Sequence, residues 1–80
     1  MEENTAMVKL PTYDIYAASF LSLNNIQPTL VKTGTRVVFE FDATSTVRNL
    51  LARYNENPVV HVLDFVHHLR RIRSQMLSAR

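Results

Sequence analysis

Two histidines and an aspartate near the end of the chain have the types and spacing that could bind a metal. His61, Asp64 and His68 stand at positions i, i+3 and i+7 of the segment VVHVLDFVHHLRRIRSQMLSAR, which would put them on one face of a helix. Two imidazoles and a carboxylate suit zinc or nickel. The same residues also fit a structural role, with His61 as a helix cap and Asp64 stabilised by the helix dipole. Since no fourth ligand is visible, we favour the structural role and expect no metal and no other cofactor.

A histidine beside an aspartate also raises general acid–base catalysis. That chemistry needs a pocket and a nucleophile within reach of the base. The chain has a single glycine, Gly34, so it has no glycine-rich loop, and it contains no known catalytic spacing. We therefore expect a protein that is not an enzyme and has no catalytic residues.

The cations of the same segment could instead follow the phosphates of a nucleic acid. His67, Arg70 and Arg71 are the candidate contacts, because each neutralised phosphate releases counterions. Against this, Asp64 interrupts the basic patch, and no aromatic side chain is interleaved to stack on bases. Cations near the end of a helix are also favoured by the helix dipole. Nucleic-acid binding is thus the second hypothesis.

Arg73 is unusual because it falls within the apolar ladder of this helix, about 20° from Val62 at 100° per residue. Its side chain could snorkel from the rim of the core, and this is the favoured interpretation. The other interpretation is a partly buried ion pair with an acid elsewhere in the chain, namely Asp14, Asp42 or Glu40.

The length and composition of the chain predict one small domain. Its 80 residues are 46% hydrophobic, as in globular chains, but so small a domain buries only about 60% of its unfolded surface. The absence of cysteine excludes disulfides and thiolate metal sites. The segment MEENTAMVKLPTYD has two early acids and no long apolar run, unlike a signal peptide. No segment suits a membrane span, and we expect a cytoplasmic location.

The chain is expected to be flexible over residues 1–11 and helical directly afterwards. The segment PTYDIYAASFLSLNN has apolar residues at helical spacing. Thr12 is the expected N-cap, and Asp14 would lie in the first turn, where the helix dipole favours an anion. Asn24 and Asn25 tolerate the left-handed conformation that ends many helices.

The middle of the chain is predicted to form a two-stranded β-hairpin. In PTLVKTGTRVVFEF, Gly34 separates two runs of β-branched residues, and glycine readily supplies the positive φ of a tight turn. The alternation of the second strand predicts that Phe39 and Phe41 face the core, whereas Val38 points to the other face.

Val38 and its expected strand neighbour Val31 are candidate residues of a protein interface. They would be exposed on a sheet with two free edges, which is marginal alone. Exposed β-branched residues and open edges favour self-association or capture of another chain. Two lone valines are also ordinary on a protein surface, so both interpretations stay open.

Two further helices complete the prediction of an αββαα domain of the α+β class over residues 12–80. The first covers DATSTVRNLLARYNENP, with Thr44 or Ser45 as its cap. The second begins near His61, which with Asp64 resembles a capping box. Its core-facing ladder is predicted to be Val62, Phe65, Val66, Leu69, Ile72 and Met76.

Several short motifs, mostly at expected core positions, occur together in this order. They are Asp14-Ile15 with Ala17 and Leu21, then RVVFEF, LLARY, VHVLDF and LRRIRSQM. Over roughly residues 12–77 the chain thereby resembles a family of small bacterial and phage domains of unknown function. The resemblance implies the fold but brings no substrate, cofactor or catalytic residue. Members tend to carry glycine after the first helix, where this chain has Asn24-Asn25.

These patterns favour a small non-enzymatic interaction module, either a homodimer or a binder of another protein, of the kind that a phage or mobile element would carry. The alternative is a weak nucleic-acid-binding protein that uses the basic C-terminal helix. Salt separates the two, because phosphate binding weakens steeply as salt rises and an apolar interface does not.

Overall fold

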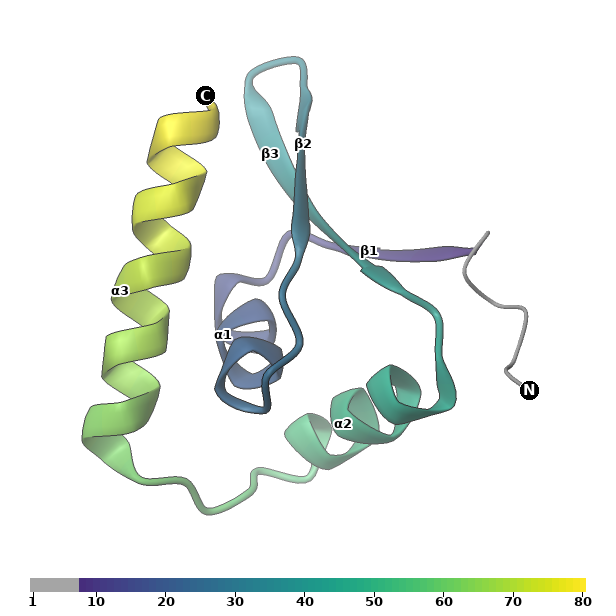
Figure 1. Cartoon of the computed structure of the whole chain (residues 1–80), viewed down its shortest axis with the longest axis vertical. Coiled ribbons are helices and arrows are strands. Elements are labelled where there is room, and N and C mark those ends of the chain that lie inside the picture. Colours follow the sequence, from purple (N-terminus) through teal and green to yellow (C-terminus); the bar gives the residue numbers. More distant parts are fainter. Residues whose placement is uncertain (1–7) are drawn as a thin grey trace.

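The computed structural model describes residues 8–80, which form a three-stranded antiparallel sheet and three helices (Figure 1). In chain order the elements are β1 (Lys9–Thr12), α1 (Ile15–Leu23), β2 (Thr29–Thr33), β3 (Arg36–Asp42), α2 (Ser45–Asn55) and α3 (Val62–Ala79). The predicted α+β class and the order helix, hairpin, helix, helix are confirmed. Within the described residues, no helix is both long enough and apolar enough to cross a membrane.

Strand β3 is the centre of the sheet and pairs with β1 on one side and β2 on the other. The register of β2 and β3 puts Val31 opposite Val38 and Thr33 opposite Arg36. Between the two strands, Gly34 has a φ of +64°, a conformation that glycine adopts at little cost because it has no Cβ. The predicted hairpin is therefore confirmed.

Strand β1 departs from the expectation of a flexible segment over residues 1–11. Lys9 stands opposite Asp42 in the register with β3, and their side chains form an ion pair. Pro11 cannot donate a backbone hydrogen bond, which suits its place on an edge strand. Four residues that include a proline give a weak strand signal, and the pairing with β3 outweighs it. The rest of the predicted flexible segment, residues 1–7, lies outside the described residues.

Asp14 caps the start of α1, in place of the expected Thr12. Its Oδ1 accepts hydrogen bonds from the amides of Tyr16 (2.9 Å) and Ala17 (3.2 Å), which have no partner within the helix. Thr12 is instead the last residue of β1, and its hydroxyl accepts from the amide of Asp14 (3.0 Å). Because the strand takes up Thr12, the cap moves two residues along the chain.

The end of α1 is closed by an asparagine in the left-handed conformation, as predicted. Asn25 has a φ of +68°. The amide of Ile26 donates to the carbonyl of Leu21, and the amide of Asn25 donates to that of Ser22, both at 2.9 Å. This is the Schellman arrangement, which satisfies carbonyls that the helix leaves unpaired.

The starts of α2 and α3 have unequal caps. Thr44 caps α2 as predicted, since its hydroxyl accepts from the amide of Val47 (3.1 Å). α3 starts directly after His61, also as predicted, but the His61 side chain makes no capping hydrogen bond. The predicted capping box of His61 and Asp64 is therefore wrong. Imidazole lacks the short side-chain oxygen that serves this role in serine, threonine or aspartate.

The residues of the core come from all three helices and from the sheet face that carries Phe39 and Phe41: α1 contacts β1 and α3, α3 also contacts β2, and α2 packs against α1 (Figure 1). The buried cluster draws on every helix and on β3: Ala18, Leu21, Phe39, Phe41, Val47 and Ile72. The predicted core face of β3 is confirmed. Phe65 and Leu69, also expected in the core, are only half-buried.

Replacing Phe39 by alanine should lower the free energy of unfolding by about 3–5 kcal/mol, because it leaves a cavity where the three helices meet the sheet. Urea unfolding followed by circular dichroism measures this. Leu63→Ala is the matched control: Leu63 is 80% exposed, so its change should stay within about 0.5 kcal/mol. Equal losses in the two variants would contradict this assignment of the core.

Candidate interaction site

The predicted interface residues Val31 and Val38 are neighbours across β2 and β3, but they do not form an exposed apolar pair. Val38 is only 6% exposed, and Val31 is half-buried. The expectation of an exposed Val38 is therefore wrong. Val38 belongs to the central strand and lies opposite Val31 of β2, while the pairing of β1 with β3 begins at its neighbour Phe39. The prediction of a two-stranded sheet had left out this third strand.

His68 is held by a buried serine, which sequence reasoning missed. A hydrogen bond joins His68 Nδ1 to the hydroxyl of Ser22 on α1 (2.8 Å), and the Nε2 of Gln27 donates to the same hydroxyl (3.4 Å). Ser22 is 1% exposed, so no substrate reaches its hydroxyl, and the pair connects α1 to α3. The signal in the sequence was the presence of two serines, Ser19 and Ser22, in an otherwise apolar helix.

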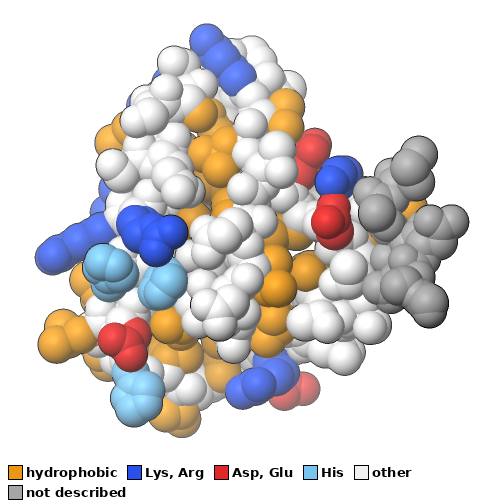
Figure 2. All heavy atoms as spheres, viewed as in Figure 1, with side chains coloured by type: hydrophobic (Ala, Val, Ile, Leu, Met, Phe, Trp, Pro, Cys, Tyr) orange, Lys and Arg blue, Asp and Glu red, His pale blue; other side chains and the backbone are white. Residues whose placement is uncertain are grey.

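The candidate metal ligands His61, Asp64 and His68 do not come together as a metal site. Within the described residues, no group of three or more histidine, aspartate or glutamate side chains is arranged to hold a metal ion. The Nδ1 of His68 is already occupied by Ser22. Figure 2 shows histidine side chains spread with one acidic side chain along the outer surface of the molecule.

The arginines of α3 are exposed to solvent. Arg70, Arg71 and Arg73, and His67 beside them, all have exposed side chains. Among residues 8–80 the structure describes one ion pair, Lys9 with Asp42. The ion pair of Arg73 with Asp14, Asp42 or Glu40 is therefore not formed among these residues. The Arg73 side chain is exposed and lies outside the core.

Apolar side chains are most exposed at the start of α3. Val59 is 97% exposed, Val62 70% and Leu63 80%, and these three residues are called the apolar start of α3 below. Val62 was predicted to face the core, which is wrong. It lies about 80° around the helix from the buried Ile72 and six residues before His68, which bonds to Ser22 in the last turn of α1.

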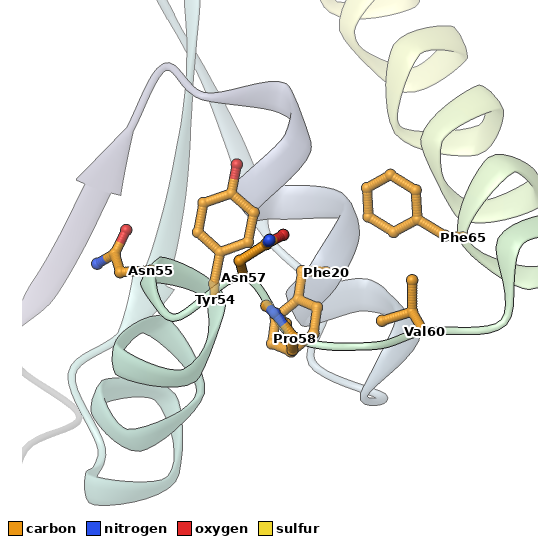
Figure 3. A pocket seen from close by; sticks show the side chains of 7 residues that line it. All are labelled: Phe20, Tyr54, Asn55, Asn57, Pro58, Val60 and Phe65. Atoms are coloured by element: carbon orange, nitrogen blue, oxygen red, sulfur yellow. The ribbon is translucent and has the colours of Figure 1, made fainter.

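A cleft of about 400 Å³ lies beside the apolar start of α3, between the end of α2, α1 and the first turns of α3 (Figure 3). Its walls are mainly aromatic and aliphatic: Phe20, Tyr54, Asn55, Asn57, Pro58, Val60 and Phe65. The rings of Phe20 and Tyr54 pack 5.8 Å apart between centroids. A smaller hollow on the other side of Phe20 and Val60 also takes in Val59, His61 and Asp64. Phe20 and Val60 line both the cleft and the smaller hollow. Both hollows therefore adjoin the apolar start of α3.

Asn57 shapes the cleft by ending α2 sharply. Its φ of +59° turns the chain away from the helix, and its amide donates to the carbonyl of Tyr54 (3.2 Å). Pro58 follows, which cannot continue a helix. The predicted helical segment ended with NENP, but the sequence did not show that the connection to α3 would form the wall of a cleft.

Tyr54 is the titratable group of the cleft with a perturbed pKa. Its partial burial raises its pKa, and the negative charge of Asp14 and the hydrogen bond from the Tyr54 hydroxyl to Asp14 Oδ2 (3.1 Å) act in the same direction. All three favour the neutral phenol. The hydroxyl is thereby committed to Asp14, the residue that caps α1, and ties α2 to the start of that helix.

The Ser22–His68 hydrogen bond should contribute measurably to stability. His68→Ala removes a partner from a buried hydroxyl, so we expect a loss of about 1–3 kcal/mol. A double-mutant cycle with Ser22→Ala should give a coupling energy of about 0.5–1.5 kcal/mol. His67→Ala is the control, since its exposed ring should cost less than about 0.5 kcal/mol. Additive losses for His68 and Ser22 would show that the bond does not hold the helices together.

Tyr54 should make stability depend on alkaline pH. Its folded pKa lies above the unfolded value of about 10, so its contribution is complete below pH 10 and is lost as pH rises through the folded pKa. Tyr54→Phe should remove this part of the decline in unfolding free energy. In an ultraviolet titration, the difference between the parent and Tyr54→Phe is the tyrosinate absorbance of Tyr54. The midpoint of this difference should lie above pH 10, and a midpoint at or below pH 10 would contradict the burial of the hydroxyl.

Comparison of the chain with protein-family models, with curated proteins and with solved structures found no match. The geometry of the described residues is therefore the basis for a function. It brings an exposed apolar surface and an apolar cleft together at the start of α3, and it puts exposed arginines further along the same helix.

Proposed function

We propose that this protein is a small non-enzymatic interaction module that binds another protein through the apolar start of α3. The observation that carries the proposal is the exposure of Val59, Val62 and Leu63, which ranges from 70% to 97% within five positions of the chain. Clustered exposed aliphatic side chains are costly in water and mark surfaces that another molecule covers. This surface replaces Val31 and Val38 as the interface.

The adjoining cleft supports binding rather than catalysis. The seven residues that line it are aromatic, aliphatic, proline or asparagine, and its one ionisable group, the Tyr54 hydroxyl, is bonded to Asp14. Such a cleft offers no ready base or nucleophile, but it can receive a large apolar side chain. Interfaces commonly concentrate their binding energy in an anchor of this kind.

The resemblance to small bacterial and phage domains belongs to the same proposal. It implies an accessory protein of a bacterium, phage or mobile element. We also propose a cytoplasmic location, because a chain without cysteine gains nothing from an oxidising compartment. The alternative is that two copies of the chain associate through the apolar start of α3 as a homodimer. The experiment below distinguishes a homodimer from a complex with another protein.

Nucleic-acid binding is the second candidate, favoured by the exposure of His67, Arg70 and Arg71. By helix geometry the three side chains lie within an arc of about 100° on α3. Leu63, which is 80% exposed, lies within the same arc and offers phosphates nothing. An exposed apolar side chain on the same side of the helix, one turn before these cations, makes this candidate the weaker one.

The proposal is tested by replacing Leu63 with a photo-reactive amino acid in the full chain and irradiating it in nuclease-treated lysate of the producing cells. A protein adduct should form in high yield. Thr33 is the matched control, because it is exposed at the tip of the hairpin, far from the start of α3 (Figure 1). The same adducts from both positions would contradict the proposal, and an adduct of the chain with itself would replace the partner by a homodimer.

The nucleic-acid candidate makes a different prediction. We expect that the parent chain shows no binding to duplex or single-stranded DNA that depends on Arg70 and Arg71. Arg70→Glu and Arg71→Glu should each change the free energy of unfolding by no more than about 0.5 kcal/mol. Fluorescence anisotropy over a series of salt concentrations measures this. Binding abolished by the double variant, with log affinity falling linearly with log salt, would make nucleic acid the partner.

A further inference from the structure

One side of α3 carries a narrow stripe that the rest of the fold does not cover. At 100° per residue, five positions fall within an arc of about 80°. They are called the outer stripe: Val62, Val66, Arg70, Arg73 and Leu77. Val62 is 70% exposed and Leu77 53%, Arg70 and Arg73 are exposed, and Val66 is half-buried. The stripe thus has apolar side chains at both ends and two cations between them.

The cations of the outer stripe have no acidic partner within hydrogen-bonding distance among residues 8–80, where the ion pair described is Lys9 with Asp42. The one acid of α3, Asp64, lies about 120° around the helix from Arg70. Over its full length α3 carries three arginines and one aspartate. Two positive charges therefore lie on an otherwise apolar seam without an acidic partner in the part of the chain that the structure describes.

We infer that the outer stripe binds an amphipathic helix of another protein, one that carries acidic residues beside its apolar face. This rests on the proposed function and names the partner's chemistry. The partner's aliphatic side chains would pack on Val62, Val66 and Leu77, while its carboxylates pair with Arg70 and Arg73. Arginine suits this role because its guanidinium pairs with carboxylates in two parallel hydrogen bonds.

The cleft fixes where the partner's largest apolar side chain goes. Phe65 lines the cleft, and Val62, the first residue of the outer stripe, is three positions earlier on α3 and about 60° around the helix from it. A helix on the stripe therefore passes the mouth of a hollow of about 400 Å³. The partner's apolar anchor belongs at the start of α3, and its acidic residues belong beside the second half of α3.

A second copy of this chain does not fit the outer stripe. A two-fold axis brings the same patch of both copies together. In a parallel pairing each arginine would meet itself. In an antiparallel pairing the middle of the stripe, at Arg70, would meet its own copy. Either arrangement puts like charges against each other in a desolvated interface, which costs several kilocalories per mole of affinity.

A membrane or a nucleic acid fits less well than a helix. A helix that lies in a membrane surface presents a broad apolar face, whereas an arc of about 80° is close to the narrow seam of paired helices. For a nucleic acid, three of the five stripe residues are aliphatic and none is aromatic, so the stripe offers neither enough phosphate contacts nor stacking.

The test uses a display library of helical peptides with a fixed leucine seam and flanking positions randomised among Glu, Lys and Gln. Selection on the full chain should enrich Glu at the flanking positions. Selection on the Arg70→Glu, Arg73→Glu variant should enrich Lys at the same positions. The control Arg48→Glu, Arg71→Glu changes the net charge equally at exposed sites off the stripe and should still select Glu. A selected acidic peptide should lose about tenfold affinity or more on the stripe variant, as the loss of close charge pairs predicts.

Three outcomes would overturn the inference. They are equal enrichment of Glu and Lys on the parent chain, an equal loss of the Glu preference in the control, and binding that survives Val62→Asp. Tighter binding of duplex DNA or of vesicles with anionic lipids, lost in the stripe variant, would also overturn it in favour of those partners. If the adduct from position 63 still forms while the peptides show no charge preference, the interaction module stands and only the acidic partner is wrong.

Discussion

The burial of α1 is the constraint on which the other elements depend. Six consecutive residues of this helix, from Ala17 to Ser22, are no more than 5% exposed, because the sheet, α2 and α3 surround it. Such a helix must be apolar or small on nearly every side, and its polar atoms need partners. Ser19 donates its hydroxyl to the carbonyl of Ile15 (2.7 Å), and Ser22 bonds to His68.

Once α1 is enclosed, the positions of the surrounding helices follow. α3 packs through one side, around Ile72 and Met76, and extends past α1 at its start. α2 reaches the other flank of α1 through Tyr54, whose ring packs on Phe20 and whose hydroxyl is bonded to the cap of α1. The connection between α2 and α3 contributes Asn57, Pro58 and Val60 to the cleft, opposite Phe20 of α1. The hollow and the exposed start of α3 are consequences of packing two helices on one short central helix.

The candidate chemistry of the sequence is largely used for structure. His68 contributes a hydrogen bond between α1 and α3, Asp14 caps α1 and receives the Tyr54 hydroxyl, and Asp42 pairs with Lys9 across β1 and β3. The arginines of α3 and the aliphatic residues beside them are among the groups that the fold does not use in this way. Their combination on the uncovered side of one helix is what supports a protein partner with acidic and apolar side chains.

The sequence by itself determined the hairpin around Gly34, the core face of Phe39 and Phe41, the threonine cap of α2 and the asparagine end of α1. These features depend on the period of a strand and on the conformations that single residues adopt, so a local pattern is enough to predict them. Only the tertiary structure decided that Lys9–Thr12 is a strand, that Val38 is buried, that Val62 is exposed and that Ser22 meets His68. Each of these features depends on which helix or strand lies alongside. A helical or alternating pattern shows that a residue can face a neighbouring element, but it does not show where that element ends. The candidate site arises where α3 extends beyond its neighbours, and for that reason the apolar ladder alone did not reveal it.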